Sequence, residues 1–140
     1  MTSIQPLLIA FASTDGLNVD GHFGSCAQFY IYRIDADGYQ KIEVREASSE
    51  RGIEKNAQRA QAIADCHLLF CESIGGPAAA RVIRSGIYPM KCKVSNTGPA
   101  TIEAQLLLLQ TRIQSGSLPP WLRKLTGQAD ALNHHFQALP

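Results

Sequence analysis

The stretch DGLNVDGHFGSC (residues 15–26) lies between two apolar segments, and the rest of the chain is organised around it. The segments LLIAFA (7–12) and FYIYRI (29–34) both have the composition of buried β-strands. A hairpin joins two strands with a few residues, whereas this connection is long and carries three glycines. Long connections inside compact domains commonly carry function. Phe23, near the centre of the loop, argues against disorder because a large aromatic ring there gains by docking against the protein.

Composition and charge restrict the class of protein. The chain has 140 residues, of which 45% are hydrophobic and 18% charged, as in a soluble domain with a core of its own. A formal net charge of +1 gives no bulk electrostatic reason to expect nucleic acid or a membrane surface as a partner. No apolar run approaches the roughly 20 residues of a membrane helix, and the first residues lack the basic segment of a secretion signal. We therefore expect a cytoplasmic protein.

Four cysteines are present, and their spacing matches no zinc motif because none of them forms a CxxC pair. A cytoplasmic domain of this size does not need disulfides for stability, so reduced thiols are expected. We interpret Cys66, His67 and Cys71 as structural residues of one short strand. Lys91, Cys92 and Lys93 end the last strand, where they either add charge and a thiolate to a site or simply face solvent.

The hydrophobic pattern predicts an α/β fold. Strands at 28–35 and 39–46 are joined by the tight turn DADG and form an antiparallel hairpin. Strands then alternate with helices, which implies parallel pairing with right-handed crossovers. The prediction is a mixed five-stranded sheet with helices on both faces, a core domain over 1–126 and a C-terminal tail over 127–140. The other expected elements are strands at 6–13, 67–71 and 87–93 and helices at 53–64, 77–84 and 99–114, with a short helix before residue 126.

The long loop offers one imidazole and one thiol, four residues apart. His22 follows the expected central strand, where loops build sites in open α/β sheets, and imidazole binds iron, zinc and copper. Cys26 could supply a thiolate for iron, or a nucleophile activated by His22. The simpler alternatives are a surface histidine and a small buried cysteine, which is the usual state of a reduced thiol.

Gly75 and Gly76 form a second candidate, because they follow a strand and open a helix that carries Pro77 in its first turn. The first N–H groups of a helix have no partner inside it and therefore attract anions. A tight strand-to-helix turn is the alternative reading. This turn and the end of the first strand both lie at carboxyl ends of strands, so they could face one cleft.

Common catalytic motifs are absent from the sequence. The first strand carries no carboxylates of the kind that a two-metal nuclease requires, and there is no GxSxG, Walker A or GxGxxG motif. No pair of carboxylates stands out as acid and base. The groups that remain are one imidazole, some thiols and backbone donors, which is a set typical of a binding site. We therefore predict a protein that is not an enzyme.

Separated segments, in a fixed order, carry a resemblance to a known family. They are AFAS (10–13) with DGHFG (20–24), IGGPAAAR (74–81), GIYPMK (86–91) and PPWL (119–122). With these segments the chain resembles the nitrogenase accessory factors, the family of NifX, NifY and NafY that is also related to the C-terminal part of NifB. The resemblance runs from about residue 7 to about residue 126. IGGPAAA and PPWL are most similar to the NifY/NafY core domain.

The resemblance implies a ribonuclease-H-like fold without nuclease activity. It also implies a carrier and chaperone that binds the iron–molybdenum cofactor, or its iron–sulfur precursor, and delivers it to apo-dinitrogenase alongside other cofactor-assembly proteins. The histidine of the HFG motif is tied to cofactor binding in NafY-type members, and here it is His22, which we predict to be the metal ligand. The other residues that we predict to contact the cofactor are Phe23, Gly24, Cys26, Gly75 and Gly76.

Two other readings remain open at this stage. In the first, the domain is a docking module that stabilises apo-dinitrogenase without ligating the cluster, with Phe23 and Trp121 as contacts. In the second, it is an enzyme with Cys26 as nucleophile and His22 as base. Longer NifY/NafY members carry an additional N-terminal helical domain that the resemblance assigns to docking. This chain begins almost at its first strand, so the resemblance supports cofactor binding more than docking.

Overall fold

The computed structural model describes residues 5–47 and 54–126 of the chain. Its strands form one sheet in the order β3-β2-β1-β4-β5. β2 pairs antiparallel with both β1 and β3, whereas β4 pairs parallel with both β1 and β5. The predicted mixed five-stranded sheet is therefore confirmed. The strands are β1 (Leu7–Ala12), β2 (Gln28–Asp35), β3 (Gly38–Glu46), β4 (Leu68–Cys71) and β5 (Tyr88–Lys91).

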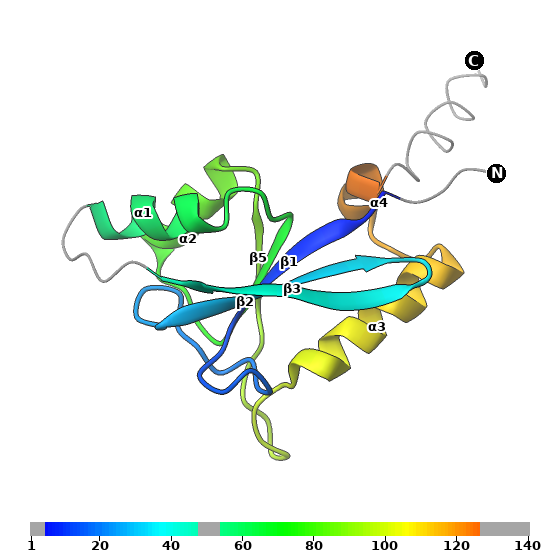
Figure 1. Ribbon diagram of the computed structural model, residues 1–140, viewed down its shortest axis with the longest axis horizontal. Helices are drawn as coiled ribbons and strands as arrows, with labels where there is room; N and C mark the ends of the chain where they lie inside the picture. Colours follow the sequence, from blue (N-terminus) through cyan, green and yellow to red (C-terminus); the bar gives the residue numbers. More distant parts are fainter. Residues whose placement is uncertain (1–4, 48–53, 127–140) are drawn as a thin grey trace.

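Helices cover both faces of the sheet, as predicted. α1 (Glu54–Ala62) and α2 (Gly76–Arg84) lie together on one face, and α3 (Ile102–Ser115) lies on the other (Figure 1). α4 (Pro120–Thr126) adds Leu122 to the core on the α3 side. Within the described residues, no helix has both the length and the apolar character needed to cross a membrane.

β1 lies at the centre of the sheet and is buried on both faces, which explains its uninterrupted apolar sequence. Ala10 and Ala12 pack into the core cluster beneath α1 and α2, while Ile9 and Phe11 pack into the cluster beneath α3. Leu8 packs on the same side as Ala10 and Ala12, so both faces of β1 are covered by core residues. β1 therefore provides a fixed platform for the loop that follows it.

Some predicted boundaries shift for local reasons. α3 begins at Ile102 rather than at residue 99, because the Thr101 side chain caps it by accepting a hydrogen bond from the Ala104 N–H at 3.1 Å. β5 covers only Tyr88–Lys91 of the predicted segment 87–93. The predicted tail 127–140, which contains His134 and His135, lies outside the described residues.

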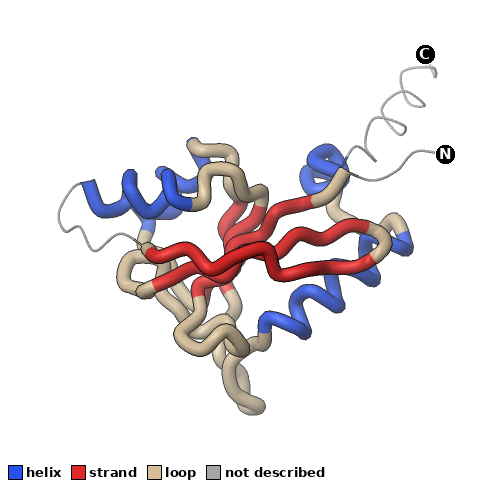
Figure 2. Tube along the Cα trace, viewed as in Figure 1, coloured by secondary structure: helices blue, strands red, loops and turns tan. Residues whose placement is uncertain are grey.

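The loops that follow β1, β4 and β5 meet at one end of the sheet, because these strands run parallel to one another. Figure 2 shows loop segments gathered at this end, below the sheet in that view. At the other end, His67 is structural as predicted, since its Nδ1 accepts a hydrogen bond from the Leu8 N–H at 3.0 Å. The end that gathers the loops is therefore the place to look for a site.

The buried thiols give a pH dependence that can be measured. Burial raises the pKa of Cys66 and of Cys71 from an ordinary value of 9.0 to about 12. The neutral thiols therefore stabilise the fold below pH 9, and this contribution is lost as the pH rises from 9 towards 12, because the unfolded chain ionises first. We expect the urea concentration at the midpoint of unfolding, measured under reductant, to decrease when the pH is raised from 9 to 10.5.

A Cys71→Ala variant provides the control for this pH dependence. It is expected to be less stable at pH 7.5, because a buried side chain is truncated, but to lose less stability between pH 9 and 10.5. An equal loss in both proteins over that pH range would show that Cys71 does not contribute.

Candidate functional site

Backbone hydrogen bonds fix the path of the loop that carries His22. The Gly21 N–H donates to the Ala12 carbonyl at 3.0 Å, immediately beyond β1. The Glu72 N–H donates to the Gly21 carbonyl at 2.9 Å, and the Phe23 N–H donates to the Ser73 carbonyl at 3.0 Å. His22 and Ser73 thus form a parallel β-bridge that continues the pairing of β1 with β4. The structure brings the loop and the segment before α2 together, as the sequence predicted.

The imidazole of His22 lies at the surface between two polar side chains. Its Nδ1 is hydrogen-bonded to the Ser73 hydroxyl, and its Nε2 lies 3.3 Å from a carboxylate oxygen of Glu72. The side chain of His22 is 54% exposed and that of Glu72 is 23% exposed. Because the ring is half exposed, a ligand that displaces the Glu72 carboxylate can reach Nε2 while Ser73 still holds Nδ1.

Phe23 lies in the interior. Its ring is fully buried in the core beneath α1 and α2, with its centroid 5.8 Å from that of Phe29. The Ser25 and Cys26 N–H groups both donate to the His22 carbonyl, which closes a tight turn directly after the histidine. Phe23 therefore anchors the backbone next to His22, and its own side chain does not face the surface where a ligand of His22 would bind.

Arg59 of α1 holds the inner side of the same turn. Its guanidinium is buried and donates to the carbonyls of Phe23 at 3.0 Å and Cys26 at 2.8 Å. A buried guanidinium that donates to loop carbonyls is a rigid attachment, because breaking these hydrogen bonds leaves both the charge and the carbonyls without partners. Phe23 and Arg59 together fix the backbone that carries His22.

Cys26 is separated from the imidazole of His22 by the fold. It is only 6% exposed and belongs to the core cluster beneath α1 and α2, where its thiol lies 3.9 Å from the Phe23 carbonyl. Burial raises the pKa of Cys26, and this effect outweighs the opposing influence of Arg59. Of the predicted site residues, the structure places Phe23 and Cys26 in the core and leaves the His22 side chain at the surface.

Gly75 and Gly76 are exposed and open α2. Gly75 occupies the N-cap position in an extended conformation, without any side-chain cap. Because Pro77 has no N–H, the donors of the first turn without a partner inside the helix are those of Gly76 and Ala78, which follow Ser73 by only a few residues. Lys55 adds positive charge near the loop, since its ammonium nitrogen would lie 3.3 Å from a Cβ placed on Gly24.

The sequence did not single out Glu72, Ser73 or Arg59. Glu72 and Ser73 directly precede the glycine motif, so their position in the chain offered a signal, but nothing in the sequence pairs them with His22. Arg59 gave no signal, because a charged residue on a surface helix is ordinarily solvated. Across residues 5–47 and 54–126, no three His, Cys, Asp or Glu side chains are grouped to hold a metal ion.

The sequence model of a protein family described as "Dinitrogenase iron-molybdenum cofactor" matches residues 5–108 of the chain. The chain belongs to this family. Among its relatives, the chain is 49% identical to NifY of Klebsiella pneumoniae over 123 residues, which cover 86% of this chain and 52% of that protein. It is 35% identical to NifX of Rhodobacter capsulatus over 131 residues, which cover 88% of this chain and 79% of that protein. The family resemblance seen in the sequence is therefore confirmed.

The chain spans about half the length of the NifY relatives that it matches. A solved structure of similar fold is the apo form of the orange protein from Desulfovibrio gigas, with a TM-score of 0.58 and 22% sequence identity. The similarity covers 84% of this chain and 94% of that one. At this level of identity the comparison shows a shared fold only.

Proposed function

We propose that this member of the dinitrogenase iron-molybdenum cofactor family binds the iron–molybdenum cofactor, or its iron–sulfur precursor, and delivers it to apo-dinitrogenase in the cytoplasm. The cluster is cargo, and the protein acts as a carrier and chaperone on a ribonuclease-H-like scaffold, not as an enzyme. The observation that carries this proposal is the surface-exposed imidazole of His22, mounted on a loop whose backbone is fixed on both sides.

The surroundings of His22 suit a ligand that must bind a metal cluster and later release it. Ser73 engages Nδ1, so Nε2 is the nitrogen available to a metal after it leaves the Glu72 carboxylate. A histidine held in one orientation binds a metal with less loss of side-chain freedom. A single protein ligand permits transfer to another protein, whereas four thiolates enclosing a metal would retain it.

The groups around the imidazole favour an anionic metal–sulfide cluster. The N–H groups at the start of α2 lie close in sequence to Ser73, and the Lys55 ammonium lies beside Gly24, two residues after His22. Both supply positive potential to a bound anion. Glu72 carries a negative charge, which opposes the binding of an anion. It is paired with His22 in the free protein, and the cluster would take its place at the imidazole.

The alternative of a Cys26 nucleophile makes a clear prediction about reactivity. Because Cys26 is buried and its pKa is raised, we expect no alkylation of Cys26 by iodoacetamide at pH 7.5 in the native protein. Cys92 is partly exposed and is expected to react before Cys26. Peptide mapping by mass spectrometry, with urea-unfolded protein as the fully reactive control, measures the order. Selective alkylation of Cys26 would instead favour an enzyme.

Anaerobic titration with isolated iron–molybdenum cofactor tests the carrier proposal directly. We expect stoichiometric iron and molybdenum to co-elute with the protein on gel filtration. A His22→Ala variant is expected to lose at least tenfold in affinity while keeping the wild-type urea midpoint, because the side chain is half exposed and its removal leaves the loop contacts intact.

The matched control for His22→Ala is the double variant His134→Ala, His135→Ala, which removes two other imidazoles and keeps His22. It should bind like the wild type. Cofactor affinity that is normal in a folded His22→Ala variant would refute His22 as the ligand. A folded wild-type protein that binds no cofactor, but is captured by purified apo-dinitrogenase, would favour the docking module over the carrier.

A further inference from the structure

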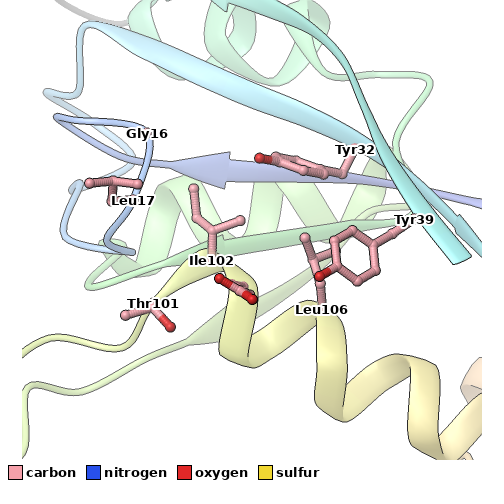
Figure 3. A pocket seen from close by; sticks show the side chains of 8 residues that line it. Gly16, Leu17, Tyr32, Tyr39, Thr101, Ile102 and Leu106 are labelled. Atoms are coloured by element: carbon pink, nitrogen blue, oxygen red, sulfur yellow. The ribbon is translucent and has the colours of Figure 1, made fainter.

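A cavity of about 460 Å³ lies on the opposite face of the sheet from α1 and α2. Its walls come from the first half of the long loop, from β2 and β3, and from the first turns of α3. Figure 3 shows the rings of Tyr32 and Tyr39 on one side of this space and Leu17, Ile102 and Leu106 around the remainder. The volume is in the range of cavities that hold a small molecule or one large side chain.

The chemistry of this cavity differs from that around His22. Of its aliphatic residues, Leu17 is exposed, whereas Ile102 and Leu106 are almost fully buried, and the phenol rings of Tyr32 and Tyr39 belong to the same lining. Glu103 is the one charged residue among the described residues that line it. A cavity lined by aliphatic side chains, aromatic rings and a single carboxylate suits an occupant with an aliphatic stem and a cationic head.

An anion is disfavoured in the same place, although the cavity borders the start of a helix. The Ile102 N–H already donates to the Leu17 carbonyl at 2.9 Å, and the Ala104 N–H donates to the Thr101 hydroxyl at 3.1 Å. Asp15, next to Gly16 of the cavity wall, adds a second negative charge. Backbone N–H groups of Asn18 and Leu17 lower the pKa of Asp15 to about 2, so it is ionised at neutral pH. An anionic cluster would meet the Glu103 carboxylate here.

Exposed apolar side chains lie in the cavity wall and on the elements that form it, which indicates a protein occupant and not a free amine. Leu17 in the wall is 70% exposed, and Leu107, one turn after Glu103 on α3, is 50% exposed. Val44 of β3 is 43% exposed. Val44 pairs with Tyr30 of β2, and Tyr39 pairs with Ile34 of β2. Tyr30 and Ile34 both face the α3 side of the sheet, so Val44 and Tyr39 share that face. A small ammonium ion would leave these side chains in water, whereas a polypeptide would cover them.

We propose that this cavity receives a lysine or arginine side chain of a partner protein. The aliphatic stem lies along Leu17, over the buried side chains of Ile102 and Leu106, and the cationic head lies against Glu103 and the tyrosine rings. Apolar residues flanking that basic residue cover Leu107 and Val44. This docking surface is separate from His22, so one molecule could hold its cargo and a protein partner together.

Nuclear magnetic resonance titration of the whole chain with blocked tripeptides tests this proposal. The probes are Ac-Leu-Lys-Leu-NH2, its neutral match Ac-Leu-Gln-Leu-NH2, its anionic match Ac-Leu-Glu-Leu-NH2, and n-butylammonium. We expect the lysine peptide to shift amide signals of the cavity wall and to bind at least fivefold more tightly than the other three probes. Glu103→Gln should remove this preference over the glutamine peptide.

Two variants separate this surface from its alternatives. Leu107→Ser should weaken the lysine peptide but leave n-butylammonium unchanged, and His22→Ala should alter neither. Equal binding of the three peptides, or stronger binding of the glutamate peptide, would overturn the proposal. Binding of n-butylammonium as tight as that of the lysine peptide would also overturn it, in favour of a free amine. Since His22→Ala measures cargo binding and Glu103→Gln measures docking, failure of one does not imply failure of the other.

Discussion

Replacing Gly21 with alanine is expected to destabilise the protein by about 3 kcal/mol, because the added methyl group has no space. A Cβ on Gly21 would lie 2.7 Å from the carbonyl carbon of Ala12 and 2.9 Å from its Cβ and oxygen. These are backbone atoms and the first side-chain atom of the central strand, so no flexible side chain can rotate away. The strain falls on β1 or on the loop.

The two hydrogen bonds of Gly21 prevent the loop from moving away cheaply. Its N–H is bonded to Ala12 and its carbonyl to Glu72, so separating the loop from β1 breaks the pairing that continues from β1 to the segment after β4. Urea unfolding monitored by circular dichroism measures the loss. We also expect Gly21→Ala to weaken cofactor binding, since the residue next to the clash is His22.

Gly38→Ala is the matched control for Gly21→Ala. A Cβ on Gly38 meets nothing within 4 Å, and its backbone does not adopt the left-handed conformation that disfavours alanine. Its effect should stay within about 0.5 kcal/mol, as for an ordinary surface substitution. If Gly21→Ala were as mild as Gly38→Ala, the close contact between the loop and β1 would be refuted.

The glycine illustrates what the sequence could and could not predict. Alternation and apolar runs along a chain report burial, so they predicted the strands and both helical layers, whereas the docking of Phe23 was predicted from its aromatic ring inside a loop. Three glycines in one loop indicated an unusual backbone without showing which of them touches a strand. A Cβ on Gly21 would meet the backbone of Ala12 and one on Gly24 the flexible end of Lys55, and this difference follows from the packing of the loop against the sheet and α1.

The polar half of the site was harder to predict for a related reason. His22 was singled out because its position after a central strand has a meaning that local sequence carries. Its neighbours Glu72 and Ser73 are 50 residues or more away in the chain, and they become neighbours through the parallel pairing of β1 with β4. Cys26, four residues from His22, appeared to be the natural partner, yet the tight turn after the histidine directs its thiol into the core. For the neighbours of His22, proximity in sequence therefore predicted less than the pairing of the strands.

Replacing Arg59 with methionine is expected to destabilise the protein by about 2 kcal/mol and to loosen the turn after His22. Methionine fills similar space but cannot donate, so the buried carbonyls of Phe23 and Cys26 lose the guanidinium that satisfies them. One effect opposes this cost. The Nε of Arg59 is buried with no hydrogen-bond partner among the described residues, and removing an imperfectly satisfied buried cation recovers part of its desolvation penalty. We expect the loss of a donor for two buried carbonyls to lower the free energy of unfolding by more than the removal of one unpaired N–H raises it.

Urea unfolding and amide hydrogen exchange separate the two consequences of Arg59→Met. The exchange of the Ser25 and Cys26 N–H groups, which donate to the His22 carbonyl, should accelerate more than the exchange of amides within β1. Arg84→Met, the same change at an exposed arginine of α2, is the control and should alter neither quantity appreciably. If Arg59→Met matched this control in both measurements, Arg59 would not be what holds the turn. The orientation of His22 would then depend on Phe23 and the bridge to Ser73 alone.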